Sequence, residues 1–596
     1  MTEENRNLIL AFSLSMLVLF GWFYFVDRPR MEAEQAQLQA TAQQSPTPAP
    51  QAAASAGADA SGIPHPGAVP AGITGGQGTD VAGAATASRA EILTRTPRIH
   101  IDNGQVHGSI SLQGGRLDDL TLATYRETVS PDSAEIVLLS PAGTPEPYYA
   151  EYGFVAADGG KIPLPNNQTL WSGDVNQVLR PGSPVTMQWD NGAGLKFTRT
   201  YEVDEHYLFT VTERVENSGA APVSLMPYGL VSRHYTPKVS GYYILHEGLL
   251  GVLGGSLNEV TYKNIRETGS AKTQSTGGWL GITDKYWLVS LIPDQAADFA
   301  GSFSYNPMGG RDRYQADYLR AAVTIQPGQS TEVTNRLFAG AKKVSLIDAY
   351  ANKYSITLFD RAIDWGWFYF LTKPLFVLID WFYGLTGNFG ISIILLTLTV
   401  KAAFFPLANK SYVAMSKMKK LQPLMLEIRE KFPDDKLRQQ QEMMDLYKRE
   451  KANPLSGCLP MVVQIPVFFA LYKVLFVTIE MRHAPFFGWI NDLASPDPTT
   501  LFNLFGLIPW TPPSFLMIGL WPILMGVSMW MQQRLNPAPA DPVQEKVFKW
   551  MPVFFTFLLG KFPAGLVIYW TVNNVLSIIQ QTIIMKREGA EVSFRW

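Results

Sequence analysis

The chain has 596 residues, of which 46% are hydrophobic and 17% are charged, and its formal net charge is −2. This length exceeds one ordinary globular domain, and so low a charged fraction does not suit a plain soluble protein. The near-neutral total excludes nucleic-acid binding through a broadly basic surface. The single cysteine, Cys458, excludes an internal disulfide framework and a cysteine-built zinc site.

The first apolar segment runs from Leu8 to Val26 without a charged residue. At about 1.5 Å per residue it is long enough to cross a bilayer core of about 30 Å. A cleaved signal peptide is the competing interpretation, but the preceding residues are not basic and no small-residue cleavage pattern follows. We therefore predict an uncleaved anchor at residues 1–27. Residues 28–91 are mostly Ala, Gly, Pro, Gln, Ser and Thr, and this composition predicts a flexible linker.

Short alternating runs of apolar and polar residues dominate residues 92–345. Residues 195–203 and 207–215 are examples, and they lie on either side of a turn at Asp204 and Glu205. Period-two alternation punctuated by Gly, Asn, Asp and Pro is typical of antiparallel strands with one buried face. A stretch of this length predicts one large β-sandwich domain.

The remainder of the chain is membranous in composition. Residues 365–389 mix aromatic residues with Lys373 and Asp380 around Pro374, which predicts an amphipathic helix in the membrane interface, a seventh span being the alternative. We assign this interfacial helix to residues 346–388. Five apolar segments follow, and with the anchor they predict a six-span α-helical bundle in a multi-domain membrane protein. These segments are Gly390–Leu407, Leu459–Thr478, Phe515–Met531, Val547–Gly560 and Leu566–Ile584.

Lys and Arg are concentrated in the loop between the second and third spans. The loop after the third span offers Arg482, and the turn between the fifth and sixth spans offers Lys561. Because Lys and Arg are enriched in cytoplasmic loops, the rich loop is predicted to be cytoplasmic, the β-domain external and both termini cytoplasmic. Arg28 and Arg30, which follow the first span, argue weakly for the opposite orientation.

Several kinds of chemistry are excluded by missing motifs. The sequence holds no GxxxxGK[ST] loop and no HExxH motif, and the predicted spans contain no Asp or Glu. These absences argue against an ATP motor, a zinc protease and an aspartyl intramembrane protease. We therefore expect a non-enzymatic protein without a cofactor or a metal.

Lys401 lies within the second predicted span, about 9 Å from its cytoplasmic end. A cation in hydrocarbon costs about 2.5–3.5 kcal/mol on insertion scales, so Lys401 either has a functional role in a wet cavity or snorkels to the headgroups. Thr397 lies on the same helical face. Other polar residues of the spans favour a water-accessible groove or, alternatively, plain hydrogen bonding between helices. They are Gln464, Thr571, Asn573, Asn574, Gln580 and Gln581.

The Lys- and Arg-rich loop predicts a helical hairpin. Residues 411–431 and 436–451 are rich in strong helix formers and are separated by the turn at 432–435. Apolar side chains along these helices form either an adaptable surface for other chains or the seam between the two helices. The pattern includes Met415, Met418, Leu421, Met425, Met443 and Met444.

Several long motifs resemble the YidC membrane protein insertases, which are related to the mitochondrial Oxa and chloroplast Alb proteins. Within residues 389–586 they are "KLQPLMLEIREKFPDDKLRQQQEMMDLYKREKANPLSGCLPMVVQIPVFFALY", "RHAPF" and "FPAGLVIYW". The stretch "LQGGRLDDLTLATY" in the predicted β-domain is similar, less densely, to the periplasmic domain of Gram-negative members.

The resemblance implies a bacterial inner-membrane protein with a supersandwich-like periplasmic domain and a five-helix insertase core at residues 389–586. It implies a cytoplasmic hairpin at 409–452 and a short cytoplasmic tail at 587–596. Clients would be inserted through a groove open to the cytoplasm and the lipid, alone or with the Sec translocon, without nucleotide hydrolysis. Lys401 stands where the family usually has an arginine, so the point charge is kept but the bidentate fork is lost.

The expected site residues combine the resemblance with the polarity of the spans. The predicted groove residues are Lys401, Thr397, Gln464, Tyr569, Trp570, Asn573 and Asn574. The predicted hairpin contacts to clients or ribosomes are Met415, Met418, Lys419, Lys420 and Leu421. Nascent membrane proteins, the Sec translocon and the lipid bilayer are the expected partners. Ribosome or targeting-factor binding is expected to be weaker because the tail is short, and no specific nucleic-acid site is expected.

Two other functions compete with this interpretation. A small-solute transporter or channel would open through both faces of the membrane and often carries inverted repeats, which the span pattern does not show. A membrane-anchored binding module would place the function in the β-domain, and deletion of residues 92–340 would then abolish it.

Overall fold

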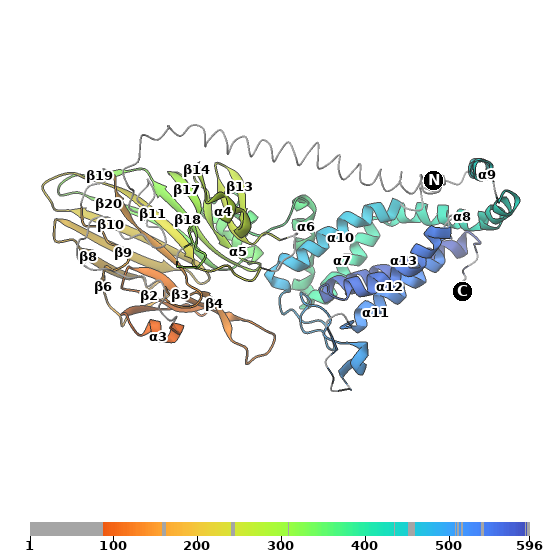
Figure 1. Cartoon of the computed structure of the whole chain (residues 1–596), viewed down its shortest axis with the longest axis horizontal. Helices are drawn as coiled ribbons and strands as arrows, with labels where there is room; N and C mark the ends of the chain where they lie inside the picture. Colours follow the sequence, from red (N-terminus) through yellow and green to blue (C-terminus); the bar gives the residue numbers. More distant parts are fainter. Residues whose placement is uncertain are drawn as a thin grey trace. The chain divides into compact units, whose positions relative to one another are not determined.

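The β-domain and the helical region are covered by a computed structural model of the chain (Figure 1). It describes residues 87–157, 162–239, 245–307, 309–433, 435–450, 459–506, 508, 510, 512–513, 516–537, 542–590 and 592. The predicted anchor at 1–27, most of the linker at 28–91, and Cys458 lie outside the described residues. The predicted linker boundary at residue 91 falls inside a short helix, α3 (Arg89–Leu93), which Ser88 caps with its side chain.

The first sheet of the β-domain has eleven strands, and its pairings are antiparallel except for the β1–β7 edge. Its strands are, in spatial order, β14 (Ser270–Thr276), β17 (Asp298–Tyr305), β18 (Tyr314–Arg320), β11 (Val223–Arg233), β5 (Tyr148–Ala156), β3 (Arg116–Arg126), β2 (Val106–Ser111), β1 (Arg98–Asp102) and β7 (Val178–Leu179), with β19 (Val323–Ile325) on β11 and β4 (Glu135–Leu139) on β3.

The second sheet has nine strands and is antiparallel throughout. Its strands are, in spatial order, β13 (Ser256–Thr261), β12 (Gly248–Leu253), β15 (Trp279–Thr283), β16 (Trp287–Ile292), β20 (Ser330–Ala341), β10 (Leu208–Asn217), β9 (Leu195–Val203), β8 (Val185–Asp190) and β6 (Ser172–Gly173). A single short helix, α4 (Tyr262–Thr268), follows the edge strand β13.

The two sheets contribute side chains to one hydrophobic core. Phe154 on β5 meets Phe197 on β9 with ring centroids 5.9 Å apart, and the Tyr152 hydroxyl donates to the carbonyl of Arg336 on β20. Burial of these large aromatic side chains is the main stabilising contribution of such a core, at about 1.5–3 kcal/mol for each fully buried apolar side chain.

The predicted strand pair around the turn at Asp204 is confirmed. β9 and β10 pair antiparallel from Leu195 opposite Asn217 to Val203 opposite Phe209. The Asp204 carboxylate accepts the backbone N–H groups of His206 and Leu208, which closes the turn as an Asx motif.

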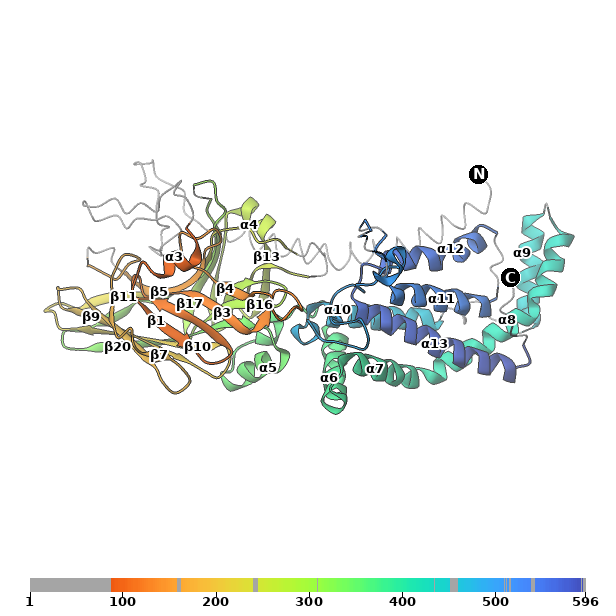
Figure 2. The same ribbon diagram turned by 90° about the horizontal axis from the view of Figure 1, so that it is seen from below.

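Fourteen helical segments are described in all, and α3 and α4 belong to the β-domain with α5. The others form the helical region, and Figure 2 shows the whole chain from below. The helices after the last strand are α5 (Val344–Lys353), η2 (Phe359–Ala362), α6 (Tyr369–Thr386), α7 (Phe389–Ala403), α8 (Phe405–Lys431), α9 (Lys436–Arg449), α10 (Leu459–Val477), η4 (Ile479–Met481), η5 (Leu501–Gly506), α11 (Leu520–Leu535), α12 (Pro542–Leu559) and α13 (Ala564–Arg587).

Residues 346–388 do not form the single interfacial helix that the sequence predicts. The segment contains the end of α5, then η2, and then α6, which alone coincides with the aromatic-rich stretch. Ser355, Leu358 and Gly366 have φ values of 52°, 51° and 71°. Left-handed residues cannot continue a right-handed helix, so they divide the segment.

The predicted span Gly390–Leu407 is not continuous, which corrects the sequence-based prediction. α7 ends at Ala403, α8 begins at Phe405, and the two helices are bent by 68°. Pro406 stands in the first turn of α8, where it lacks an N–H donor and its ring would collide with the carbonyl four residues earlier. The bend therefore follows from the sequence at the point where α7 ends.

The predicted segments 515–531 and 547–560 correspond to the helices α11 and α12, whose ends are shifted. α11 begins five residues later than predicted, and α12 has 18 residues although its apolar stretch, 547–560, is shorter. Within the described part of the chain, no single helix is both long and apolar enough to pass as a membrane span, whereas the bent α7–α8 pair passes as a unit. Gln464–Val477 forms a shorter apolar helix.

A close contact between α11 and α12 depends on Gly526. A Cβ placed on Gly526 would lie 2.0 Å from the Thr556 hydroxyl oxygen and 3.4 Å from the Thr556 Cβ. Gly526→Ala is therefore expected to destabilise the protein by about 1–3 kcal/mol, as overpacking does elsewhere. Thermal unfolding of the purified chain in detergent checks this. Thr556→Ala, which removes the colliding oxygen, should be mild alone and should restore most of the lost stability in the double variant. An additive double variant would contradict the contact.

Candidate functional site

Lys401 lies in the last turn of α7, directly before the bend. Its ammonium donates to the Ser577 hydroxyl on α13 at 2.7 Å, and that hydroxyl donates onward to the backbone carbonyl of Asn573 at 2.8 Å. Lys401 is half-buried, Ser577 is 1% exposed, and none of the ion pairs between described residues includes Lys401. A positive charge is thus held between helices by a neutral partner.

Ser577 is the site residue that the sequence reasoning missed. It lies four residues after Asn573 and four before Gln581, so the three share one face of α13. All three are buried, at 4%, 1% and 0% exposure. The i, i+4 spacing of polar residues in an otherwise apolar helix was the available signal.

Thr397 does not contact Lys401 through its hydroxyl. It is 1% exposed, and its hydroxyl donates to the carbonyl of Ile393 in its own helix at 2.7 Å. Gln464 is half-buried on α10. The structure therefore brings Lys401 into contact with α13, whereas the Thr397 hydroxyl bonds within its own helix, α7.

Two further polar groups of α13 bind α11. The Asn574 amide donates to the Ser528 hydroxyl at 3.0 Å, and the Gln581 amide donates to the side-chain oxygen of Asn536 at 3.0 Å. The Gln581 side-chain oxygen is buried and has no hydrogen-bond partner. Hydrogen bonding between helices, rather than a water-accessible groove, therefore explains the Asn574 side chain. It also explains the amide nitrogen of Gln581, but not its side-chain oxygen.

The two aromatic residues predicted for the groove face different surroundings. Tyr569 is 2% exposed and belongs to the main hydrophobic core. Trp570 is half-buried and meets Phe468 on α10 edge to face, with ring centroids 4.7 Å apart, and Phe555 on α12 at 5.8 Å. Trp570 on α13 thus packs against both α10 and α12.

The hairpin of α8 and α9 has an apolar seam. Leu421, Met425 and Leu446 are buried in one cluster, with Met418 and Met443 packed against it. Met415 instead packs toward α13 beside Ile584, and Met444 is 50% exposed. Leu421, which the sequence offered as a client contact, is therefore used between the two helices.

Lys419 and Lys420, the two lysines predicted to contact clients or ribosomes, both have interactions within the protein. Lys420 donates to the carbonyl of Glu588, just after α13 ends, and Lys419 is half-buried with its own interactions. Lys420 thus joins α8 to the C-terminal end of α13.

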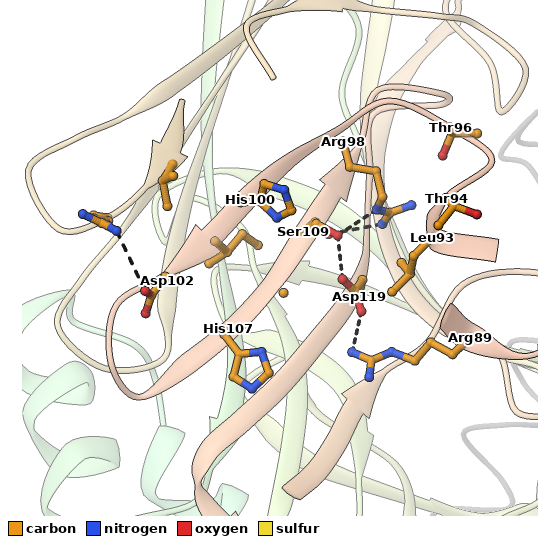
Figure 3. A pocket seen from close by; sticks show the side chains of 14 residues that line it. Arg89, Leu93, Thr94, Thr96, Arg98, His100, Asp102, His107, Ser109 and Asp119 are labelled. Atoms are coloured by element: carbon orange, nitrogen blue, oxygen red, sulfur yellow. Dashed lines mark hydrogen bonds and ion pairs between the residues drawn. The ribbon is translucent and has the colours of Figure 1, made fainter. Parts of the chain in front are cut away.

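The β-domain has an open hollow of about 780 Å³ beside α3 and the β1–β2 hairpin (Figure 3). Its cations are already paired: Arg89 with Asp119, Arg98 with Asp118, and Arg180 with Asp102. A hollow whose charges neutralise one another has no net attraction for an anion.

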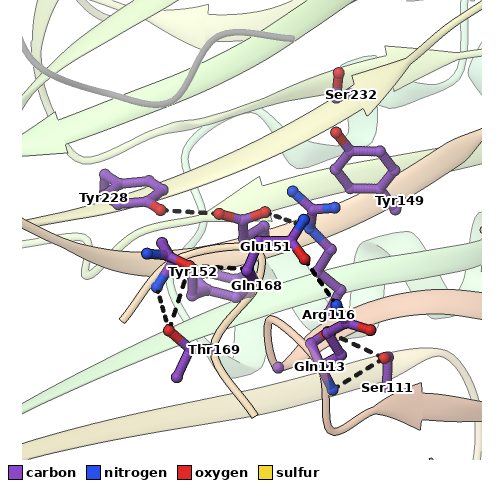
Figure 4. A network of polar contacts seen from close by, with 12 residues as sticks. Ser111, Gln113, Arg116, Tyr149, Glu151, Tyr152, Gln168, Thr169, Tyr228 and Ser232 are labelled. Atoms are coloured by element: carbon purple, nitrogen blue, oxygen red, sulfur yellow. Dashed lines mark hydrogen bonds and ion pairs between the residues drawn. The ribbon is translucent and has the colours of Figure 1, made fainter. Parts of the chain in front are cut away.

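A second polar cluster of the β-domain is buried (Figure 4). Arg116 pairs with Glu151 at 2.5 Å, and the Tyr228 hydroxyl donates to the other oxygen of Glu151 at 2.9 Å. Both carboxylate oxygens are satisfied, so the cluster stabilises the sheet. Among the described residues, no group of His, Cys, Asp and Glu could hold a metal ion.

The chain matches two protein-family models. Residues 98–378 match the YidC periplasmic domain, and residues 381–591 match the 60Kd inner membrane protein family. A relative from Bradyrhizobium diazoefficiens, named Membrane protein insertase YidC, is 53% identical over 610 residues, covering 99% of this chain and 98% of the relative. A relative of the same name from Methylobacterium nodulans is 54% identical over 602 residues, covering 99% of this chain and 96% of the relative.

One similar solved structure is described as an active YidC insertase with the first transmembrane domain resolved. It is 19% identical to this chain, with a TM-score of 0.36, and the match covers 81% of this chain and 92% of that one.

Proposed function

The chain belongs to the YidC family of membrane protein insertases, and on that premise we propose that its clients pass through a polar groove beside Lys401. The protein is an inner-membrane insertase with a periplasmic domain that is rich in β-sheet, and insertion is a non-enzymatic function. The observation that carries the groove proposal is the half-buried Lys401 ammonium, bonded to the Ser577 hydroxyl and outside every ion pair between described residues.

Such a cation lowers the cost of bringing an acidic client segment into the membrane region. Attraction between unit charges about 4 Å apart is worth about 4 kcal/mol at the effective dielectric of a protein surface, against about 1 kcal/mol in water. Ser577 holds the ammonium without neutralising it, so its charge stays available to a client carboxylate. Gln464 and Trp570 are the other half-buried members of the predicted set and supply a polar and an aromatic contact.

The membrane topology is part of the same proposal. Six spans, with the anchor at 1–27 as the first, place the β-domain in the periplasm, and both termini are then cytoplasmic. The uneven distribution of Lys and Arg among the loops supports this orientation. We assign the two packed sheets of residues 92–345 to the supersandwich class on the basis of their shared core.

α6 lies in the plane of the membrane interface in this proposal. Its most exposed apolar residues recur at helical spacing along one stripe: Phe370, Val377, Trp381 and Leu385, with exposures of 72%, 54%, 59% and 66%. A helical stripe of aromatic and aliphatic side chains is the surface that sinks into a headgroup boundary. Lys373, which lies beside this stripe, is paired with Asp348 and Asp360.

The helical hairpin of α8 and α9 is proposed to make further contacts, both to clients and to other partners. We propose that the exposed apolar side chains Leu424, Leu426 and Met444 contact emerging clients, since the seam already uses Met418 and Leu421. Cooperation with the Sec translocon, and a weaker contact to ribosomes or targeting factors through the basic hairpin, complete the proposal.

Reconstitution tests the proposal against a solute transporter or channel. Proteoliposomes that contain only the full-length chain are expected to insert a small membrane protein with a short acidic leading segment, without added nucleotide. Protection of that segment from external protease is the readout, and empty liposomes are the control. Solute efflux from the same vesicles, without protection above the empty liposomes, would contradict the insertase mechanism and favour the transporter.

A further inference from the structure

A cavity of about 640 Å³ lies where the edge strand β13, the segment before α6 and the helix α10 come together. It is separate from the Lys401 region, since α10 lines it near its C-terminal end while Lys401 bonds α13. Three charged side chains line it: Lys473, Asp364 and Glu259.

The charges are arranged as a fixed ion pair with an additional carboxylate. The Lys473 ammonium and the Asp364 carboxylate are 2.9 Å apart, with side-chain exposures of 12% and 19%. Asp364 is also held by the backbone N–H groups of His246 and Gly366, at 2.8 and 3.0 Å. Glu259, on the edge strand β13, adds a second carboxyl group to the lining, and burial raises the pKa of this group to about 7. Because Lys473 and Asp364 neutralise each other, the carboxyl group of Glu259 decides the sign of the lining and favours a cationic group, which also favours its ionised form.

His246 adds an uncharged acceptor to this lining. Its Nε2 donates to the carbonyl of Leu249 at 2.9 Å, and burial lowers the pKa of the imidazole. The ring is therefore neutral at pH 7, and its other nitrogen is a hydrogen-bond acceptor.

Aromatic side chains form the open side of the cavity. Trp367 is 69% exposed and lies against Phe368 with ring centroids 3.6 Å apart, while Phe469 on α10 is 50% exposed. Trp367 lies two residues before α6 begins, and the exposed stripe of α6 starts three residues later at Phe370. Aromatic faces attract alkylammonium groups and sit at the headgroup level of membranes.

The depth of the lining matches the upper part of a lipid leaflet. Lys473 lies four residues, or about 6 Å, before the end of α10 at Val477, and Phe469 lies eight residues, or about 12 Å, before it. The cavity is therefore polar near the end of α10 and apolar one helical turn deeper. A phospholipid has the same order, with its headgroup at the surface and its acyl chains below.

We propose that this cavity binds the headgroup of a zwitterionic phospholipid of the phosphoethanolamine class. The ammonium group lies between Glu259 and Trp367, and the acyl chains leave over Phe469. A bound lipid would fix the junction of α6, α10 and the sheet edge at the membrane surface. The inference depends on the membrane location of the protein and is independent of the Lys401 groove.

Native mass spectrometry of the full-length chain in detergent tests the site with three lipids of equal chain length. One carries phosphoethanolamine, one phosphocholine and one phosphoglycerol as its headgroup. We expect the phosphoethanolamine lipid to reach half occupancy at about a tenfold lower concentration than the other two. Glu259→Gln and Trp367→Ala should each remove most of that preference.

Matched controls keep the result interpretable. Glu267→Gln on α4 removes an exposed carboxylate outside the cavity, and Trp381→Ala removes an exposed tryptophan of the same stripe outside the cavity. Both should leave the preference unchanged. Equal occupancy by all three lipids would overturn the proposal, and so would a preference that Glu259→Gln and Trp367→Ala leave intact. Binding of chain-free glycerophosphoethanolamine as tight as that of the lipid would also overturn it, because the source would then be a soluble phosphate ester.

Discussion

Lys401→Glu is expected to lower the insertion of clients with an acidic leading segment by about tenfold or more. The substitution replaces attraction between the ammonium and the client carboxylates by repulsion between carboxylates. Position 401 is half-buried, and charges there interact several times more strongly than they do in water. A loss of about 1.4 kcal/mol in the favoured encounter already corresponds to tenfold. The measurement is the protease-protected fraction of the client in proteoliposomes.

Two comparisons separate the electrostatic effect from a folding defect. Lys401→Arg keeps the charge and should insert the acidic client at nearly the wild-type level, because attraction of a carboxylate needs no bidentate fork here. A client whose leading segment is neutral should be inserted almost equally by Lys401→Glu and by the wild type. Equal insertion of the acidic client by the Glu and Arg variants would refute the role of the charge.

Arg199→Met is expected to destabilise the β-domain by about 3–5 kcal/mol, because the buried Glu213 carboxyl loses its partner and must either stay charged or take up a proton. The two side chains are 2% and 3% exposed and lie opposite each other on β9 and β10, 2.7 Å apart. The Arg199 guanidinium also donates to the carbonyls of Gly115 and Tyr152 and lies over the ring of Trp171 at 4.8 Å. Amide hydrogen exchange in β9 and β10 of the full chain is the measurement.

The pH dependence of this variant has a definite sign. Burial raises the pKa of Glu213, and Arg199 is the group that opposes the increase. Without Arg199 the folded protein holds a proton on Glu213 that the unfolded chain has lost, so the penalty of the variant should grow as pH rises above the unfolded pKa of Glu213. Hydrogen exchange compared at low and neutral pH should therefore show the smaller defect at low pH.

The double variant Arg199→Met with Glu213→Leu supplies the control. Replacing both partners by apolar side chains removes the unpaired charge, so much of the lost stability should return. If the double variant were as unstable as the sum of two single variants, the pair would not be coupled and the account of this core would be wrong.

The sequence predicted those elements of the fold whose signals are local. Period-two alternation located β9 and β10, and the charged hairpin was placed at helices that the structure has at Phe405–Lys431 and Lys436–Arg449. The buried pair Arg199 and Glu213 was not singled out. Each stands on the apolar face of its strand, and only the pairing register brings the two opposite each other.

The candidate site could be predicted only in part. Lys401 was visible as a charge in an apolar segment, but its partner Ser577 lies 176 residues away on α13, and such a contact has no local signal. Gly390–Leu407 was predicted as one span, whereas the structure breaks it into α7 and α8 before Pro406. The composition of the hairpin left two roles open for its methionines, a surface for clients or the seam between α8 and α9. In the structure, Met418, Met425 and Met443 lie in the seam.

Site-specific photo-crosslinking to a stalled nascent client tests the central claim most directly. A photoreactive residue at position 401 is compared with one at Ile579, which is 51% exposed on another face of α13. The groove mechanism predicts crosslinks to the client from position 401 and none above background from position 579. Absence of crosslinks from position 401 in a folded and membrane-inserted protein, or equal yields from both positions, would contradict the mechanism.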